Sequence, residues 1–297
     1  MSKLEITIPD LKLPDGNKIP FIGYGTGTAW YKADANSPKD QKLIDAAKVA
    51  ISTGYTHLDG AEIYNTEEEL GQAIKESGVA REKLFVTSKV IANIEDIPGA
   101  IDTSLKKLGL DYVDLYLIHE PFWAKGDERA LQQKWAQMEE VAASGKAKSI
   151  GVSNYLQPHL DAILKTAKVR PAINQIEFHP YLQHGDLLAY HRIKDIKVSA
   201  YGPLLPMTQG AGGPLDPLLE SLAKKYAVSR GEILLRWVIE QDVVAVTTSS
   251  KEQRLSDYLR VFTFKMTPKE VEEISEVGRS HHFRGNWNRM FEKGDRS

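Results

Sequence analysis

Short runs of apolar residues recur along the chain at wide and regular intervals. Each run is rich in β-branched or aromatic side chains, which favour β-strands, and the residues between them follow the spacing of amphipathic helices. A strand followed by a helix, eight times in roughly 250 residues, is typical of an α/β protein with a (β/α)8 TIM barrel. The predicted strands cover residues 20–25, 55–59, 84–89, 112–119, 148–153, 173–177, 197–202 and 243–248.

Helix boundaries are visible between these strands. Ser37-Pro38 predicts the start of the first helix, as N-cap and first-turn proline, and Gly54 its end. Thr66–Glu69 and Ser229–Glu232 have the spacing of capping boxes at the start of two further helices. Gly78 ends the helix that Thr66 begins.

Three segments fall outside the strand–helix repeat. Residues 1–19 predict a β-hairpin whose turn, Pro14 to Asn17, contains the proline and glycine that tight turns favour. Residues 203–217 predict a Gly/Pro-rich loop that closes over a ligand, and residues 267–277 an extra helix before a polar tail at 279–297. Because no long polar linker divides the chain, we expect residues 1–297 to form one domain.

Composition narrows the class of protein. The chain has 297 residues, 42% apolar and 26% charged, with a net charge of −2 and no Lys/Arg-rich block, so we expect no nucleic-acid partner. It has no cysteine, which excludes disulfides and thiolate metal sites. The amino terminus lacks the apolar core of a secretory signal, and no apolar run has the length of a membrane helix. We therefore expect a cytosolic monomer that does not bind membranes.

The candidate chemistry lies at the ends of three consecutive strands. Asp59, Lys89 and His119 each end a predicted strand, and Tyr64 follows Asp59 by five residues. In a barrel of this kind the carboxyl ends of the strands converge on the face that carries catalysis. The alternative is a structural ion pair between Asp59 and Lys89 beside a hydrogen-bonded core histidine.

These residue types suit the protonation of a carbonyl oxygen. Hydride delivered to a carbonyl carbon leaves an alkoxide that must be protonated as it forms. Tyr64 could supply that proton, but its ordinary pKa of ~10 makes it a weak acid, which an ammonium ~4 Å away would strengthen by up to ~3 pKa units. Asp59 would keep Lys89 protonated, and a neutral His119 would orient the substrate oxygen. The pattern indicates a carbonyl reductase.

Such a reductase needs an external hydride source. The glycines at 23–28 do not match a dinucleotide-binding fingerprint, because the sixth position is Thr28. Ser153, Asn154 and Gln175 suit a carboxamide such as that of nicotinamide, and Tyr201 could stack on its ring. A hydroxyl-rich turn with two cations follows strand eight and is a candidate phosphate site, formed by Thr247, Thr248, Ser249, Ser250, Lys251 and Arg254.

The sequence resembles the aldo-keto reductases over nearly its whole length. GYTHLDGAEIYNTEEELG at 54–71 and LGLDYVDLYLIHEP at 108–121 are similar to the two signatures of that family, with Thr56 where arginine is usual. GVSN at 151–154, NQIEFHP at 174–180 and AYGPL at 200–204 are similar to its cofactor segments.

The resemblance implies NADPH as cofactor and a small carbonyl compound as substrate. It implies that Tyr64 is the general acid, that Asp59 and Lys89 tune its acidity, and that His119 orients the carbonyl. Ser153, Asn154, Gln175 and Tyr201 would hold the nicotinamide. The implied cofactor set also includes Asp59, the residues of the phosphate turn, and Gly25, Thr26, Gly202, Pro203 and Leu204.

The chain departs from the family pattern at three places. Thr248 replaces the lysine that meets the adenosine 2′-phosphate, but Arg254 and Lys251 remain, so we favour NADPH over NADH. Glu120 replaces a tryptophan after His119 and would alter substrate choice or form a salt bridge. Gly27 replaces another tryptophan, with Trp30 three residues on.

The nearest resemblance within the family is to a fungal branch. GTGTAWYK at 25–32 and the long opening hairpin resemble reductases of α-keto amides and of conjugated polyketones such as ketopantoyl lactone. The expected pocket residues are Trp30, Glu120, Trp123 and Trp287.

Two other functions remain open. Lys89 could form a Schiff base and make the protein an aldolase, or the barrel could bind NADPH as a non-catalytic redox sensor for a partner. Histidines 179, 184 and 191 are interpreted as surface or capping residues, and the acidic run 67–69 as a solvated first turn.

Overall fold

Eight parallel strands close into a barrel in the computed structural model, which describes residues 6–297. Neighbouring strands pair in the order β10-β3-β4-β5-β6-β7-β8-β9. The predicted (β/α)8 TIM barrel is therefore confirmed, with every predicted strand present. The strands are β3 (Ile22–Gly25), β4 (His57–Asp59), β5 (Phe85–Val90), β6 (Val113–Ile118), β7 (Ala147–Ser153), β8 (Ile173–Glu177), β9 (Lys197–Tyr201) and β10 (Val243–Thr247).

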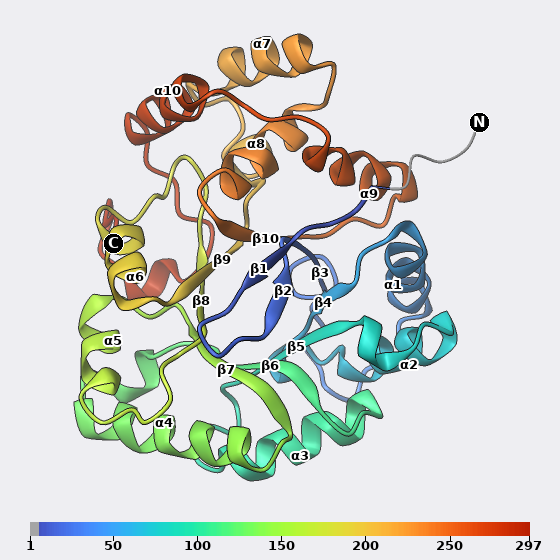
Figure 1. Cartoon of the computed structure of the whole chain (residues 1–297), viewed down its shortest axis with the longest axis vertical. Helices are drawn as coiled ribbons and strands as arrows, with labels where there is room; N and C mark the ends of the chain where they lie inside the picture. Colours follow the sequence, from blue (N-terminus) through green and yellow to red (C-terminus); the bar gives the residue numbers. More distant parts are fainter. Residues whose placement is uncertain (1–5) are drawn as a thin grey trace.

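Helices surround the barrel and bury their apolar faces on it (Figure 1). Between β9 and β10 the chain forms two helices, of which α7 is additional to the simple repeat, and α10 follows the last barrel helix. The helices are α1 (Gln41–Thr53), α2 (Glu67–Ser77), α3 (Ile97–Leu108), α4 (Glu128–Ala143), α5 (Gln157–Leu164), α6 (Leu187–Lys194), α7 (Asp216–Tyr226), α8 (Arg230–Ile239), α9 (Glu252–Leu259) and α10 (Pro268–Arg279).

A hairpin closes the amino-terminal end of the barrel. Strands β1 (Asp10–Lys12) and β2 (Lys18–Pro20) pair antiparallel across the predicted turn, where Gly16 has a φ of 93°. Leu13 and Ile19 are buried in a cluster with residues from the starts of the barrel strands: Phe85, Leu115, Ala172, Ile173 and Val244. The first strand is shorter than predicted, because residues 6–9 form no strand, and residues 1–5 of the predicted hairpin lie outside the described residues.

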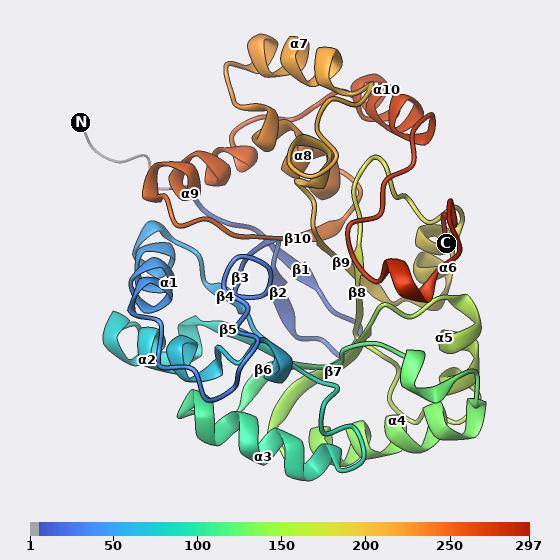
Figure 2. The same cartoon turned by 180° about the vertical axis from the view of Figure 1, so that it is seen from behind.

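The opposite end of the barrel carries the long loops and the tail (Figure 2). The segment after β3, the segment after β9 and the polar tail all cross this end. The predicted loop at 203–217 contains a short 3-10 helix, Leu205–Met207, and gives way to α7 at Asp216. The extra helix expected at 267–277 is confirmed as α10, which begins with a capping box between Thr267 and Glu270. Within residues 6–297, none of the helices combines the length and the apolar character needed to cross a membrane.

One predicted helix start and one predicted capping box were wrong. Helix α1 begins after Asp40, whose carboxylate accepts a hydrogen bond from the backbone of Lys42, and not at Ser37-Pro38. At the start of α2, Thr66 makes no side-chain cap and donates instead to the hydroxyl of Thr26. The Ser229–Glu232 box and the glycine ends at Gly54 and Gly78 are confirmed.

The acidic run at 67–69 is also not a solvated turn. Glu67 and Glu69 are buried, and each has a tertiary partner: Ser88 donates to Glu67 at 2.7 Å, and Lys32 to Glu69 at 2.6 Å. Glu69 also accepts the backbone N–H of Asp40, so it fixes the loop after β3 and the start of α1 together. Thr66 and Glu69, the two residues of the predicted capping box, therefore bond to residues outside the helix instead of to each other's backbone.

Candidate active site

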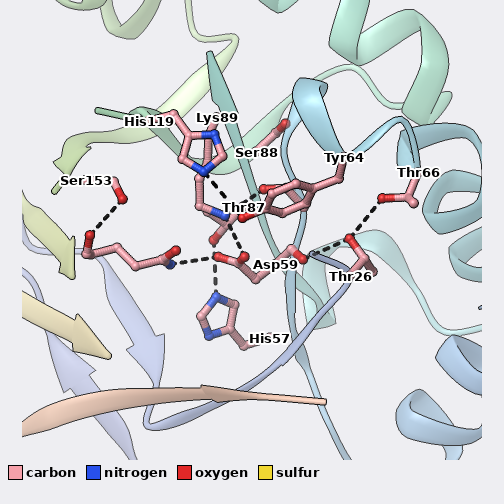
Figure 3. A network of polar contacts seen from close by, with 12 residues as sticks. Thr26, His57, Asp59, Tyr64, Thr66, Thr87, Ser88, Lys89, His119 and Ser153 are labelled. Carbon is pink, nitrogen blue, oxygen red and sulfur yellow. Dashed lines mark hydrogen bonds and ion pairs between the residues drawn. The ribbon is translucent and has the colours of Figure 1, made fainter. Parts of the chain in front are cut away.

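Asp59, Tyr64, Lys89 and His119 lie together at the carboxyl end of the barrel (Figure 3). The Lys89 Nζ donates to Asp59 Oδ1 at 2.5 Å and to the carbonyl oxygen of Gly60 at 2.8 Å. The same Nζ lies 5.1 Å from the centroid of the Tyr64 ring. The Tyr64 hydroxyl lies 3.4 Å from His119 Nε2. One acidic group, one cation and one imidazole therefore surround a single phenol.

Burial sets the charge states of this group. Burial alone would lower the pKa of Lys89, but Asp59 and Tyr64 reverse that effect and hold it above its ordinary value. Burial, assisted by the Lys89 charge, lowers the pKa of His119 well below its ordinary value. At neutral pH the site therefore contains an ammonium and a neutral imidazole.

The phenol differs from the expectation. Burial raises the pKa of Tyr64 above its ordinary value, and the Lys89 charge opposes that rise without cancelling it. The surrounding protein solvates a phenolate poorly, an effect that spacing along the sequence does not reveal. Lys89 therefore offsets the cost of forming a phenolate in a buried position, while the phenol remains protonated at rest.

The backbone around Asp59 is held on several sides. Gln175 Nε2 donates to Asp59 Oδ2 at 2.8 Å, so the carboxylate bridges Lys89 and Gln175. The carbonyl of Asp59 accepts from the backbone N–H of Thr26 at 2.9 Å and from its hydroxyl at 3.2 Å. These contacts place Thr26 and Gln175, two of the expected cofactor residues, directly beside the catalytic candidates.

The side chains expected to hold a carboxamide form one network. Ser153 donates to the carbonyl of Gln175 at 2.7 Å, and Asn154 Nδ2 donates to the carbonyl of His119 at 2.9 Å. The Tyr201 hydroxyl donates to Asn154 Oδ1 at 2.7 Å. Asn154 has a positive φ of 61°, a left-handed conformation that asparagine tolerates better than most residues. Strands β7, β8 and β9 and the residues that follow them thus contribute amide and hydroxyl groups to one side of Asp59, Tyr64, Lys89 and His119, which we call the tetrad.

The predicted phosphate turn lies between β10 and α9. Ser249 is buried and its hydroxyl accepts from the backbone of Lys251 at 3.0 Å, just before the helix begins at Glu252. Ser250, Lys251 and Arg254 are exposed. No acidic side chain within residues 6–297 forms a salt bridge with either cation. Two available cations and a helix amino terminus fit a phosphate group.

Trp30, which was expected in the substrate pocket, contacts this turn. Its indole N–H donates to the Thr248 hydroxyl at 3.2 Å, across the end of the barrel. The loop after β3 is held by Lys32, whose backbone N–H donates to the carbonyl of Tyr64 at 3.1 Å and whose side chain pairs with Glu69. That path of the loop turns the indole toward β10.

Four further cofactor candidates line the same end of the barrel. Gly25 ends β3, where an added Cβ would lie 2.9 Å from a methyl of Val246. Gly202 has a φ of 65°, and its carbonyl accepts from the backbone of Leu205, which turns the chain out of β9. Pro203 and Leu204 form that turn, with Pro203 buried and Leu204 half-buried.

Of the remaining pocket candidates, Trp287 packs against His119. Its ring centroid is 6.2 Å from that of His119 and 5.7 Å from that of Phe122. Trp123 donates its indole N–H to the carbonyl of Glu120 at 2.8 Å and packs on the core. The Glu120 carboxylate is buried and accepts the backbone N–H of Phe122. Among the described residues it forms no salt bridge, so that alternative for Glu120 was wrong.

Three histidines interpreted as surface or capping residues are buried: His179, His184 and His191. Each has a hydrogen-bond partner: Glu177 for His179 and His184, and Asn174 for His191. Their neighbourhood was hidden from the sequence because the partners lie on β8. Within residues 6–297, no group of three or more histidines and carboxylates is arranged to hold a metal ion.

At this end of the barrel Glu177 was not singled out from the sequence, and Gly27 was noted only as a departure from the family pattern. Glu177 ends β8 with its side chain buried and bonded to the tail, and Gly27 lies against the Tyr64 ring. Glu177 could have been found by the rule that identified Asp59, Lys89 and His119, because it is an ionisable residue at a strand end.

The aldo/keto reductase family model matches residues 22–279. The chain is 41% identical over 271 residues to the NAD/NADP-dependent indole-3-acetaldehyde reductase of Schizosaccharomyces pombe, covering 91% of this chain and 95% of that protein. It is 41% identical over 295 residues to the NADPH-dependent alpha-keto amide reductase of Saccharomyces cerevisiae, covering 95% of each. The crystal structure of the Bombyx mori aldo-keto reductase AKR2E4 in complex with NADP is similar, with a TM-score of 0.82, 36% identity, and coverage of 92% of this chain and 93% of that one.

Proposed function

The chain belongs to the aldo/keto reductase family, and on that premise we propose that it reduces small ketones or dicarbonyl compounds with NADPH, using Tyr64 as general acid. The observation that carries the proposal is the position of the Tyr64 hydroxyl. It lies 3.4 Å from a neutral imidazole, beside a buried ammonium that is itself paired with Asp59. A carbonyl oxygen between Tyr64 and His119 would meet two hydrogen-bonding groups at once.

The residues divide the proton chemistry among them. The Tyr64 phenol gives its proton to the oxygen as negative charge develops there. Lys89 stabilises the resulting phenolate, which burial would otherwise disfavour. Asp59 keeps Lys89 charged and in place, and His119 fixes the oxygen by a hydrogen bond. The electrostatic work is done by groups that are already oriented before the substrate arrives.

The residues at the barrel end fit a nicotinamide dinucleotide. When bound, NADPH supplies the hydride. Ser153, Asn154 and Gln175 present hydroxyl and amide groups beside the tetrad, where a carboxamide would find donors and acceptors. The exposed Lys251 and Arg254 at the start of α9 would meet the 2′-phosphate. The names of the yeast relatives, which include NADP or NADPH, support the same cofactor.

Two observations support a proposal for the substrate class: the names of the relatives and the position of Trp287. The Saccharomyces relative is named for alpha-keto amides and the Schizosaccharomyces relative for indole-3-acetaldehyde, an aldehyde that carries an indole ring. Trp287 beside His119 offers an aromatic surface to a flat or cyclic carbonyl compound. We infer that activated carbonyls such as α-keto amides, α-keto esters and conjugated polyketones, including ketopantoyl lactone, are the preferred substrates.

The geometry weighs against an aldolase. A Schiff base needs a neutral amine, but Lys89 is held as an ammonium by Asp59 and by the carbonyl of Gly60. Borohydride trapping of a carbonyl substrate on Lys89 would favour the aldolase instead. The intact tetrad weighs against a non-catalytic role as a redox sensor. A protein that bound NADPH without reducing any substrate would support that role.

The test is NADPH oxidation with a panel of an aryl aldehyde, an α-keto ester, a cyclic vicinal dicarbonyl and an aldose. We expect the fastest turnover with the dicarbonyl and the α-keto ester. If the protein bound NADPH but no member of the panel caused its oxidation, the redox-sensor function would be favoured over the reductase.

We further propose that residues 1–297 act as one domain in a cytosolic monomer. Light scattering on a sizing column tests the monomer, since a dimer would double the 33.2 kDa mass of the chain. A single cooperative unfolding transition tests the single domain.

A further inference from the structure

The carboxylate of Glu177 is the centre of a buried hydrogen-bond cluster at the end of β8. It is 2% exposed and accepts hydrogen bonds on both oxygens. Oε1 accepts from the backbone N–H of Gly285 at 2.6 Å and lies 3.1 Å from His179 Nε2. Oε2 accepts from the backbone N–H of Asn286 at 2.8 Å and from its side-chain amide at 2.9 Å. Three of the four contacts come from the tail.

The Glu177 carboxylate is charged, which suits a group that holds the tail by hydrogen bonds. Burial alone would raise the pKa of the Glu177 carboxyl, but His179 and the tail N–H groups outweigh burial and lower it. Burial lowers the pKa of His179, so its imidazole is neutral and can donate one N–H. Hydrogen bonds to a charged acceptor are the stronger ones, and a buried charge that loses them is costly.

The anchored segment leads directly to the active site. Trp287 follows Asn286 in the left-handed conformation, with a φ of 59°. That turn places the indole against His119, with a centroid distance of 6.2 Å and an angle of 75° between the rings. Phe122 packs on the same indole and on Phe291.

The same segment packs on the loop after β9. An added Cβ at Gly285 would lie 2.8 Å from a methyl of Leu205, so only glycine fits this approach without a shift. Phe283 lies against Gly210 of that loop. The anchor thus fixes residues 283–287 between the loop at 205–210 and the catalytic histidine.

We propose that Glu177 is a positioning residue for substrate specificity: by holding the backbone of Gly285 and Asn286, it sets the Trp287 wall at its distance from His119. This rests on the proposed reductase function. Glu177 does not itself touch the reacting atoms. Its loss would release the wall and weaken the binding of aromatic carbonyls, while the tetrad and the barrel strands stay in place.

The test compares Asn286→Asp with Asn288→Asp. The first puts a second carboxylate against Glu177, while the second makes the same change at an exposed position two residues on. We expect Asn286→Asp to raise KM for an aryl α-keto ester about tenfold. Its kcat for butane-2,3-dione, which is too small to need the wall, should match the wild type. Glu177→Gln, if it folds, should shift KM in the same direction.

Trypsin supplies a readout that does not depend on turnover. We expect cleavage after Arg284 and Arg289 to be several-fold faster in folded Asn286→Asp than in Asn288→Asp, with unchanged cleavage elsewhere. Equal KM values and equal cleavage in the two variants would overturn the anchor. If the wild type reduced nothing in the panel, the proposed function would fall, and the trypsin comparison alone would then decide whether Glu177 anchors the tail.

Discussion

Gly27 leaves no room for a side chain against Tyr64. A Cβ at Gly27 would lie 2.9 Å from Cζ of the phenol ring, 3.1 Å from Cε2 and 3.2 Å from the hydroxyl oxygen. Distances below about 3 Å require something to shift, and here the nearest group is the ring that carries the proposed acid. The glycine therefore lets the backbone of the loop after β3 lie directly against the Tyr64 ring.

Gly27→Ala should consequently impair turnover more than stability. The added methyl pushes the Tyr64 ring from its position beside His119, and a displacement of about 1 Å at a reacting group costs on the order of 100-fold in rate. We expect kcat to fall by about 10–100-fold with little change in the urea midpoint. Thr28→Ala, at an exposed neighbour, is the control and should keep the wild-type kcat. Normal turnover by Gly27→Ala would mean that the loop yields instead of the phenol.

The buried pair of Lys89 and Asp59 should be worth more to stability than an exposed pair. Both side chains are almost fully buried and lie 2.5 Å apart. Lys89→Met leaves the Asp59 carboxylate without its cation, and removing one partner of a buried pair costs about 3–5 kcal/mol. Urea unfolding measures this loss. The double variant Lys89→Met with Asp59→Asn should recover part of it, and a double variant as unstable as the sum of the single ones would show that the pair is not coupled.

Stability should fall as the solution is acidified below neutral pH. Burial lowers the pKa of His57 to about 4, so between pH 6.5 and 4 the unfolded chain binds a proton that the folded protein does not. Folding therefore weakens as pH drops through this window, by up to about 1.4 kcal/mol per pH unit for each such histidine. Burial lowers the pKa of His184 and His191 to about 4 as well, which adds to the slope.

Urea unfolding at several pH values from 7 to 5 measures that slope. His57→Gln keeps a hydrogen-bonding group near Thr87, the present partner of His57. Its stability should depend less steeply on pH, by about one proton in the linkage relation. A slope that is identical in the variant and the wild type would exclude a proton-free His57 in the folded state.

Arg254 should decide between NADPH and NADH. It is exposed near the start of α9, and Thr248 supplies no charge where the family has lysine. A hydrogen bond to a charged group contributes about 1.5–3 kcal/mol, so Arg254→Ala should raise the Kd for NADPH at least tenfold. The Kd for NADH, which lacks the 2′-phosphate, should not change. Fluorescence titration measures both constants, and Lys269→Ala on α10 controls for the loss of one surface charge. An equal loss of affinity for both cofactors would place Arg254 away from the 2′-phosphate.

The barrel and the tetrad were predictable because both follow from local patterns. Each strand is a short apolar run, and the alternation with helices leaves few architectures. Once the strands are placed, Asp59, Lys89 and His119 must meet, since the carboxyl ends of parallel strands share one face. The raised pKa of Tyr64 was missed because desolvation depends on what covers the phenol.

The tail contacts could not be predicted in the same way. Glu177 binds residues that are 108 and 109 positions away, through backbone groups that carry no sequence signal. The contact of the Trp30 indole with Thr248 joins residues 218 positions apart and likewise carries no local signal. At Thr66–Glu69 the capping spacing was present, and tertiary partners used the side chains instead. The conformations of loops and helix ends depend on which partner, local or distant, each side chain bonds to, and the local sequence pattern does not contain that information.

The central claim is that Tyr64 delivers the proton in carbonyl reduction, and Tyr64→Phe tests it most directly. The measurement is NADPH oxidation with the cyclic vicinal dicarbonyl, beside the Kd for NADPH. The phenyl ring retains the packing of the phenol and loses only its hydroxyl. We expect the Kd to stay within about twofold and kcat to fall by about 100-fold to 10,000-fold, the usual contribution of a general acid. A variant that binds NADPH and keeps the wild-type kcat would contradict the assignment of Tyr64 as the acid.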